Sequence, residues 1–254
     1  MYLAYKFVVI TVLVAEANFC TERLSLPVNR PITENKLSYK FVTPPDILSL
    51  GGAGGRVDFG QYSFSEGHHP HFFINKNDPF GDLSAAEQNE MLSHKKSLIN
   101  TNEAYQLATN WLASVDVDVS KLEQTSKWEV RQRWCFGDNG AKILLPVFYV
   151  RWGEWNEAKV EISVDGRNKD LLELRMMNHG AFSRHPTELV KNLDKLLAIS
   201  DDEFRKYSPL ERSNLIARFA VNWPFTMTST VTNQSLMASQ TNSFATTNSP
   251  TTHE

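Results

Sequence analysis

Between residues 101 and 176 the spacing of apolar side chains changes from helical to strand-like, which constrains the fold more than any other feature. Over residues 101–115, five apolar side chains recur at helical spacing and form one stripe: Ala104, Leu107, Ala108, Trp111 and Val115. Either Thr101 or Asn102 is expected to cap this helix, because both side chains can accept a first-turn N–H. After residue 120 the period becomes two, as in strands with one buried face.

Four strands are expected after this helix. The first alternates, with Trp128, Val130, Trp134 and Phe136 on its apolar side, and Asp138-Asn139-Gly140 then favours a tight hairpin. The second, residues 143–152, is apolar on both faces and should be the most buried. Pro146 cannot donate to a ladder, so we expect a bulge there or a strand that starts near Val147. Alternating patterns at 160–164 and 172–176 complete a four-stranded antiparallel meander that the helix would cover.

Shorter patterns flank this centre. Residues 57–64 and Phe72-Phe73-Ile74 predict an N-terminal hairpin. Helices are expected from Ser84, over 187–197 and over 208–220, and capping-box spacings support them: Ser84 with Glu87, Ser200 with Glu203, and Ser208 with Glu211. The predicted class is therefore α+β, with a helix packed on a four-stranded antiparallel meander, an N-terminal hairpin and C-terminal helices.

The first 17 residues have the parts of an export signal in the expected order. Lys6 is positive, Phe7 to Ala15 is a mostly apolar run, and Ala15-Glu16-Ala17 fits a signal peptidase site. The run is shorter than the roughly 20 apolar residues that span a bilayer. We therefore expect a periplasmic or extracellular protein without a transmembrane anchor after cleavage. The alternative is that this Val- and Ile-rich run is a core strand.

The remaining segments complete the predicted organisation. Residues 18–45 contain four prolines and no sustained period, which favours an arm or linker. One domain is expected over 46–225. Residues 226–254 hold nine Thr, five Ser and no Lys or Arg, a composition typical of a disordered tail. Cys20 and Cys135 would both survive cleavage, and an oxidising compartment permits a disulfide between them; two free thiols are the alternative.

Two groups of residues are candidate sites. His68, His69 and His71 place three imidazoles within four residues and could bind Zn or Cu; a solvated hairpin tip is the alternative. The second group could form a ligand face of aromatic and cationic side chains for a peptide or glycan, with a packed sheet as the alternative. It consists of Arg131, Arg133, Arg151, Trp152 and Trp155.

The segment 101–176 resembles PepSY-type and cystatin-like modules. The resemblance rests on a helix of the kind Glu103-Ala104-Tyr105-Gln106-Leu107-Ala108, then on Val160-Glu-Ile-Ser-Val-Asp-Gly166 followed by Leu171-Leu-Glu-Leu174. It implies an extracytoplasmic protein that binds or restrains a partner, such as a protease, and is usually not catalytic.

The expected function is therefore an exported, non-enzymatic binding or interaction protein with a protein or peptide partner outside the cytoplasm. The formal net charge is −3, with 26 basic and 29 acidic residues, so no global basic field is present to attract nucleic acid. No catalytic motif was found, and no cofactor is expected unless the histidine cluster binds metal. The alternatives are a metal-binding protein or metal-dependent enzyme that uses His68–His71, and a structural envelope-associated protein.

Overall fold

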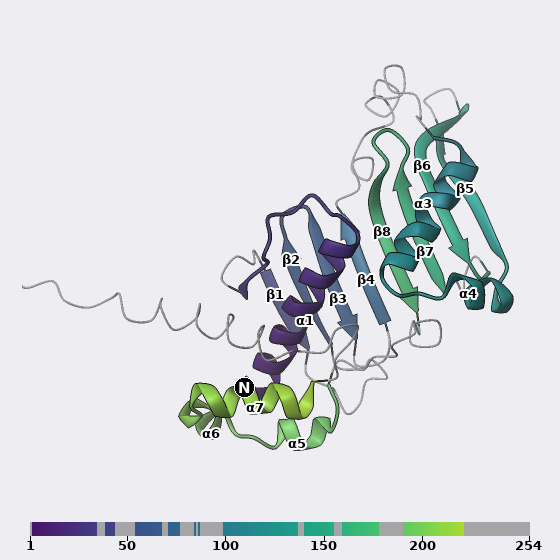
Figure 1. Cartoon of the computed structure of the whole chain (residues 1–254). Helices are drawn as coiled ribbons and strands as arrows, with labels where there is room; N and C mark the ends of the chain where they lie inside the picture. Colours follow the sequence, from purple (N-terminus) through teal and green to yellow (C-terminus); the bar gives the residue numbers. More distant parts are fainter. Residues whose placement is uncertain are drawn as a thin grey trace, which may run out of the picture.

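The computed structural model describes residues 2–34, 39–43, 54–67, 71–76, 84, 86, 99–136, 140–154, 159–177 and 190–220. The chain has the α+β fold that the sequence predicts. Its centre is one eight-stranded sheet with the order β1-β2-β3-β4-β8-β7-β6-β5, in which every neighbouring pair is antiparallel (Figure 1).

The sheet is built from two units of the same design, each a helical segment followed by a four-stranded meander. The first unit consists of α1 (Leu3–Arg23), β1 (Tyr39–Thr43), β2 (Gly54–Phe59), β3 (Tyr62–Gly67) and β4 (His71–Lys76). The second consists of α3 (Thr101–Ser114), α4 (Val119–Thr125), β5 (Trp128–Phe136), β6 (Lys142–Trp152), β7 (Val160–Asp165) and β8 (Asp170–Met177). The predicted helix and meander are therefore confirmed as the second unit, and the expected N-terminal hairpin is part of a larger meander.

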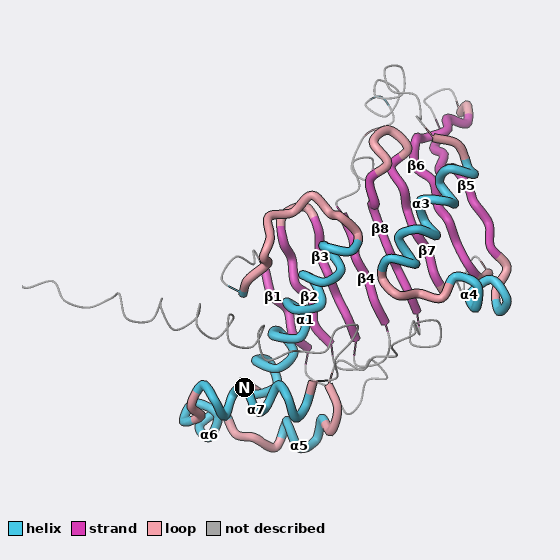
Figure 2. Tube along the Cα trace, viewed as in Figure 1, coloured by secondary structure: helices cyan, strands magenta, loops and turns pink. Residues whose placement is uncertain are grey.

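The two units join through their last strands. β4 pairs with β8, with Ile74 opposite Leu174, so the strand order of the second unit mirrors that of the first. Figure 2 shows α1 and α3 on the same face of the sheet, each over its own unit. The two joined units are therefore related by an approximate two-fold axis.

A continuous row of apolar side chains runs beneath the two helices, across six adjacent strands. Each of its members is fully buried, and register pairs connect each to the next. In sheet order the row is Val57, Phe64, Ile74, Leu174, Ile162 and Val150. Because a strand presents alternate residues to one face, this row fixes the register of both units and makes them share one core.

Helix α1 contains the segment predicted as an export signal, and its side chains are part of the core. It contacts β1, β2, β3 and the C-terminal helices. Its buried residues within 1–17 are Ala4, Tyr5, Val8, Val9, Val12, Leu13, Glu16 and Ala17. Among the described residues, α1 is the one helix whose length and apolarity would suffice to cross a membrane, and half of its apolar window is buried in the fold.

The predicted arm at 18–45 is more ordered than expected over the part that is described. Residues 18–23 continue α1, and β1 occupies 39–43. The Asn18 side chain ties the following segment down: Nδ2 donates to the Ile32 carbonyl at 2.7 Å, and Oδ1 accepts from the Ile32 N–H at 2.7 Å. The prolines at the start of this segment therefore did not indicate a loose chain, because the partly buried Asn18 side chain holds Ile32 through two hydrogen bonds.

Helix α3 begins where the sequence predicts, but Asn100 is its N-cap in place of Thr101 or Asn102. Asn100 Oδ1 accepts from the N–H groups of Asn102 and Glu103, and Glu103 Oε2 accepts from the Asn100 N–H. This reciprocal capping box requires a Glu three positions after the cap, which Asn100 alone has. The buried face includes Ala104, Ala108 and Val115 as expected, together with Leu112.

The bulge expected at Pro146 is present. The β5–β6 register passes from Gln132 opposite Phe148 to Trp134 opposite Leu144, so three residues of β6 face one of β5. Gln132 Nε2 fills the gap by donating to the Leu145 carbonyl at 2.9 Å. β7 is buried at least as completely as β6, because the first three residues of β6, beside the turn that follows β5, are exposed or half-buried.

Three short helices pack at one end of α1: α5 (Leu193–Leu197), α6 (Asp201–Lys206) and α7 (Pro209–Phe219). Asp201 Oδ1 accepts from the Leu3 N–H at 2.9 Å, and the rings of Phe7 and Phe204 lie 5.5 Å apart. The predicted caps at Ser200 and Ser208 are confirmed, whereas the helix expected from 187 starts at Leu193. The predicted tail and most of the helix expected from Ser84 lie outside the described residues.

Candidate interaction surface

Exposed large apolar side chains concentrate on the β5–β6 hairpin. Five such residues occur in the described part of the chain, and four lie on these two strands. Their exposed fractions are 48% for Trp128, 45% for Trp134, 62% for Phe136 and 53% for Leu144; the fifth is Leu210 at 70%, on α7. A contiguous exposed apolar patch of this kind marks contact sites more often than a single exposed side chain does.

Three of these residues form what we call the hairpin-end cluster: Trp134, Phe136 and Leu144. Trp134 is the register partner of Leu144. The rings of Trp134 and Phe136 meet edge to face, with centroids 5.0 Å apart, and Lys142 Nζ lies 5.0 Å from the centre of the Trp134 ring. The cluster is thus preformed. Lys142 already lies over one face of the Trp134 ring, and the exposed remainder of the cluster can contact an apolar or aromatic partner group.

Sequence analysis placed Trp134 and Phe136 on the packed side of β5. Alternation does place them on the same side as Trp128 and Val130, but the described helices leave this end of the strand exposed. Leu144 was missed, because the apolar character of 143–152 gave no indication that the first residues of β6 extend past the core. The available signal was their place beside the polar hairpin turn.

The predicted ligand face is divided between the two sides of the sheet. Trp152 is fully buried, with its ring centroid 6.1 Å from that of Tyr105 on α3. Arg151 precedes it and therefore points to the opposite face, so these two residues cannot share a surface. Trp155 lies outside the described residues. Of the five predicted residues, Arg131 is exposed and Arg133 is half-buried.

Arg151 is held by carboxylates of neighbouring strands. Its side chain is 6% exposed, and Nη2 lies 2.5 Å from Glu161 Oε2 while Nη1 lies 3.8 Å from Glu129 Oε1. Glu129 also pairs with Arg131 at 2.8 Å. Charges thus alternate across β5, β6 and β7 on the face away from the helices, which balances the charge of the guanidinium and stabilises the register of these strands.

The cysteine and histidine predictions have different outcomes. Cys20 lies in α1 and Cys135 in β5, and the disulfide that the sequence permits does not join them. The reason is geometric, because α1 packs on the first unit whereas β5 is the outermost strand of the second. His68 and His69 lie outside the described residues, as does the side chain of His71. Elsewhere in the described chain, no three His, Cys, Asp or Glu side chains gather as metal ligands.

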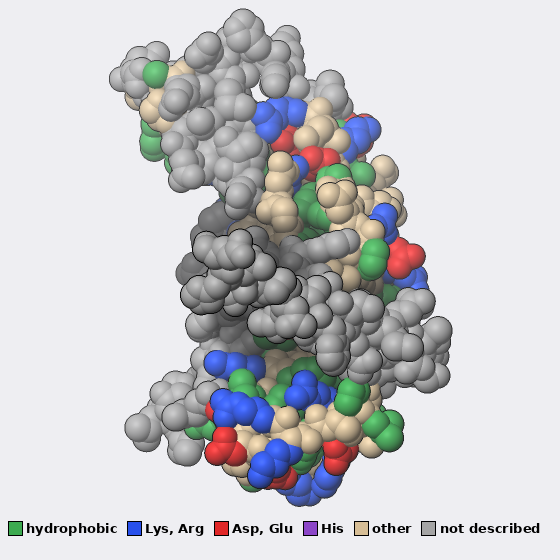
Figure 3. All heavy atoms as spheres, turned by 90° about the vertical axis from the view of Figure 1, so that its left-hand side faces the viewer, with side chains coloured by type: hydrophobic (Ala, Val, Ile, Leu, Met, Phe, Trp, Pro, Cys, Tyr) green, Lys and Arg blue, Asp and Glu red, His purple; other side chains and the backbone are tan. Residues whose placement is uncertain are grey.

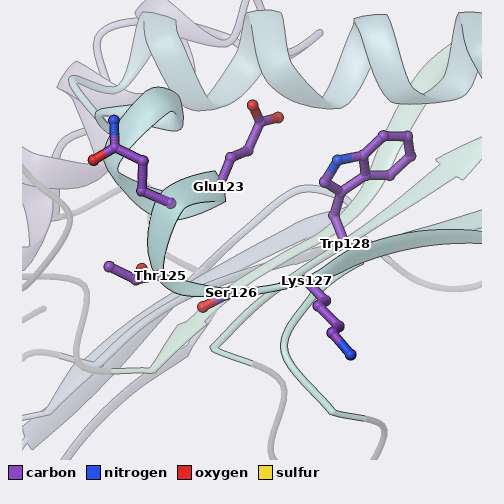
Figure 4. A pocket seen from close by; sticks show the side chains of 6 residues that line it. Glu123, Thr125, Ser126, Lys127 and Trp128 are labelled. Carbon is purple, nitrogen blue, oxygen red and sulfur yellow. The ribbon is translucent and has the colours of Figure 1, made fainter.

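A shallow, open depression of about 530 Å³ lies where α4 meets β5 (Figure 4), lined by residues 123–128. Glu123 and Trp128 point toward the helix above them, whereas Lys127 points away. On that helix, Tyr105 stacks on Trp128 at 4.2 Å and its hydroxyl donates to Glu123 Oε1. The lining is one consecutive stretch of chain, and the Ser126 hydroxyl within it has no hydrogen-bond partner among the described residues that could act as a base.

Because of two tyrosines, we expect the free energy of unfolding to fall at alkaline pH. Burial, followed by the hydrogen bond to Glu123, raises the pKa of Tyr105 to about 12. Burial and the nearby Asp170 likewise raise the pKa of Tyr62 to about 12. Because the folded state holds these protons more tightly than the unfolded state, we expect stability to be retained below pH 10 and lost toward pH 12. Urea unfolding of the wild type, Tyr62→Phe and Tyr105→Phe over this pH range measures the loss. If the free energy of unfolding falls as steeply with pH in both variants as in the wild type, the prediction is contradicted.

Outside the β5–β6 hairpin, the described surface carries mixed charge. Figure 3 shows Lys and Arg side chains interspersed with Asp and Glu at the lower end of the view, where the C-terminal helices lie. On α6, acidic residues occupy the first turn and basic residues the last turn, which complements the helix dipole.

Searches against family models, curated proteins and solved structures found no match to this chain.

Proposed function

We propose that this chain is a non-enzymatic binding protein that contacts a protein or peptide through the β5–β6 hairpin. The observation that carries the proposal is the concentration of exposed apolar side chains on one hairpin of an otherwise well-buried fold. Tryptophan, phenylalanine and arginine are enriched in protein interfaces, where they supply most of the binding energy. Trp134 and Phe136 point to one face of β5, whereas Arg131 and Arg133 point to the other, so the aromatic and leucine side chains form the proposed contact surface without these arginines.

The position of β5 supports this proposal. It is the last strand of the sheet and, within the described chain, pairs only with β6. The Gly153 N–H donates to the Lys127 carbonyl, which shows that odd-numbered residues at this end of β5 bond to β6. The peptide groups of even-numbered residues then point away from the sheet, as required for an added partner strand.

The proposal places the protein outside the cytoplasm, because α1 is apolar, long and at the start of the chain. Cleavage after Ala17 would remove eight buried side chains from the core. Fractionation of producing cells tests whether the chain is exported. The mass of the exported chain tests whether residues 1–17 are removed. Retention in the cytoplasm would contradict export, and an exported chain that begins at Asn18 would contradict a permanent core role for α1.

The binding proposal is tested with a triple variant of the hairpin-end cluster, Trp134→Ser, Phe136→Ser and Leu144→Ser. Leu210→Ser is the matched control, because it removes an equally exposed apolar side chain from α7. Proteins captured by the wild-type chain from the exported fraction are identified and their affinities measured. We expect the triple variant to lose more than about tenfold in affinity and the control to lose little. Equal binding by wild type and triple variant would exclude this surface.

A further inference from the structure

We propose that the outer edge of β5 binds β5 of a second copy of this chain, in antiparallel register with Arg131 opposite Arg131 of the other copy. This inference rests on the proposed function, because it names the partner of the same hairpin. This pairing would join the eight-stranded sheets of the two copies into one continuous sheet.

The first support is the character of the edge. β5 has nine residues and no proline. Natural edge strands are usually kept short, interrupted by proline or covered, because an open edge invites pairing. Here Trp128 and Trp134 are about half exposed along it, and Arg131 is also exposed. An exposed edge strand of this length and composition is therefore suited to pair with another strand.

The second support is hydrogen-bond geometry. Peptide groups that point away from β6 belong to even-numbered residues, as the bond between Gly153 and Lys127 establishes. Two antiparallel copies can bond only when even residues face even residues. With Arg131 at the centre, Val130 of one copy faces Gln132 of the other, which meets this condition.

The third support is that this register is self-complementary. Glu129 faces Arg133 of the second copy, and this pair occurs twice by symmetry. On the other face Trp128 meets Trp134, again twice. Opposite charges and aromatic pairs directly across an antiparallel ladder are the most stabilising combinations, and like charges are destabilising.

Neighbouring registers fit less well. Centring on Gln132 gives the longest overlap, but it sets Arg131 against Arg133 twice. Centring on Val130 sets Glu129 against Arg131 yet pairs only residues 128–132, and it leaves Trp134 uncovered. Only the Arg131-centred register satisfies both the charges and both tryptophans, with one like pair, Arg131, whose charge Glu129 already balances at 2.8 Å.

The molecule already uses this mode of assembly once. Its two units join by antiparallel pairing of β4 with β8, so that the core row continues from Ile74 to Leu174. The strand order leaves the first strand of each unit, β1 and β5, at the two outer edges. A second copy on β5 would repeat, between chains, the edge pairing that occurs within one chain.

Sedimentation of the full chain over a range of concentrations tests the proposal. We expect a monomer–dimer equilibrium in the wild type. Arg133→Glu and Glu129→Arg should each weaken it by at least about tenfold, because each sets like charges against each other in both pairs. An equimolar mixture of the two variants should recover dimers, since every mixed pair is again complementary. This recovery also shows that neither variant has simply unfolded.

Arg131→Gln is the register control. It removes the one like pair and should leave the proposed dimer at least as strong, whereas it would weaken a dimer centred on Val130 by removing both of its Glu129–Arg131 pairs. A wild-type chain that stays monomeric, a dimer insensitive to both reversals, or no recovery in the mixture would each overturn the proposal. All these variants keep the hairpin-end cluster intact, so a monomeric chain that still binds another protein would refute this inference alone.

Discussion

Deletion of residues 2–17 is expected to abolish the cooperative unfolding transition of this chain. The deleted part of α1 contributes seven buried apolar side chains and Glu16 to the core, and it covers the apolar side of β2 and β3. Burial of one such side chain is worth about 1.5–3 kcal/mol. Their sum reaches the roughly 5–15 kcal/mol that holds a typical domain together. Circular dichroism and urea titration of the shortened chain measure the loss.

Single substitutions in α1 separate core packing from a requirement of the helix for export. Leu13 is fully buried, and Leu13→Ala should lower the free energy of unfolding by about 2–5 kcal/mol. Lys6 is exposed on the same helix, and Lys6→Ala should change it by less than about 0.5 kcal/mol. If the shortened chain unfolds with the midpoint and slope of the full chain, α1 is dispensable to the fold.

Trp152→Ala is expected to be the most destabilising single truncation in the second unit. Trp152 is among the largest fully buried side chains of the molecule, and it lies between β6 and α3. Loss of a buried tryptophan leaves a cavity that the rigid sheet cannot close, with a cost of about 3–5 kcal/mol. The change in urea midpoint, at unchanged slope, reports this value.

Trp134→Ala is the matched control, since it removes the same side chain from a position that is 45% exposed. It should cost far less stability while weakening binding by the β5–β6 hairpin. The opposite pattern, a tolerated Trp152→Ala with lost binding, would restore Trp152 to the ligand face that the sequence suggested.

The second unit was predictable from sequence because its signals are local. The stripe on α3, the alternation along the strands and the Asn139-Gly140 turn each need only a few neighbouring residues. Even the bulge followed from one residue, Pro146, which lacks the N–H that a regular ladder requires. The caps at Ser200 and Ser208 were predictable for the same reason, since the capping box is complete within four positions.

The first unit was harder to predict because its signals depend on distant partners. An apolar run near the start of a chain has the same composition in a signal peptide and in a helix that packs on a sheet. The strands β2 and β3, on which α1 packs, begin more than thirty residues after α1 ends. β1 sits in a proline-containing segment without clear alternation. Its pairing with β2 could not be inferred locally.

The candidate surface was half predictable. Arg131 and Arg133 on β5 were predicted as site residues, but they were grouped with Trp152, which lies on the opposite face of the sheet. Alternation placed Trp134 and Phe136 on the correct side of β5, but as packed side chains. Alternation does not indicate how far along β5 the covering helix, α3, extends. Whether Trp134 is core or surface depends on where α3 ends above the sheet, and no pattern within β5 records that. By contrast, Arg151 and Trp152 were predicted as site residues, but both side chains are buried in contacts within the fold.

The seam between β4 and β8 has a consequence for synthesis of the chain. Ile74 and Leu174 are partners, so the first unit leaves the ribosome about a hundred residues before the strand that completes it. During that interval β4 is an unpaired edge, and a nascent neighbour could occupy it in place of β8. The yield of native protein should therefore depend on how fast translation proceeds from residue 76 to 177, and slow codons in that stretch would favour exchanged or aggregated chains.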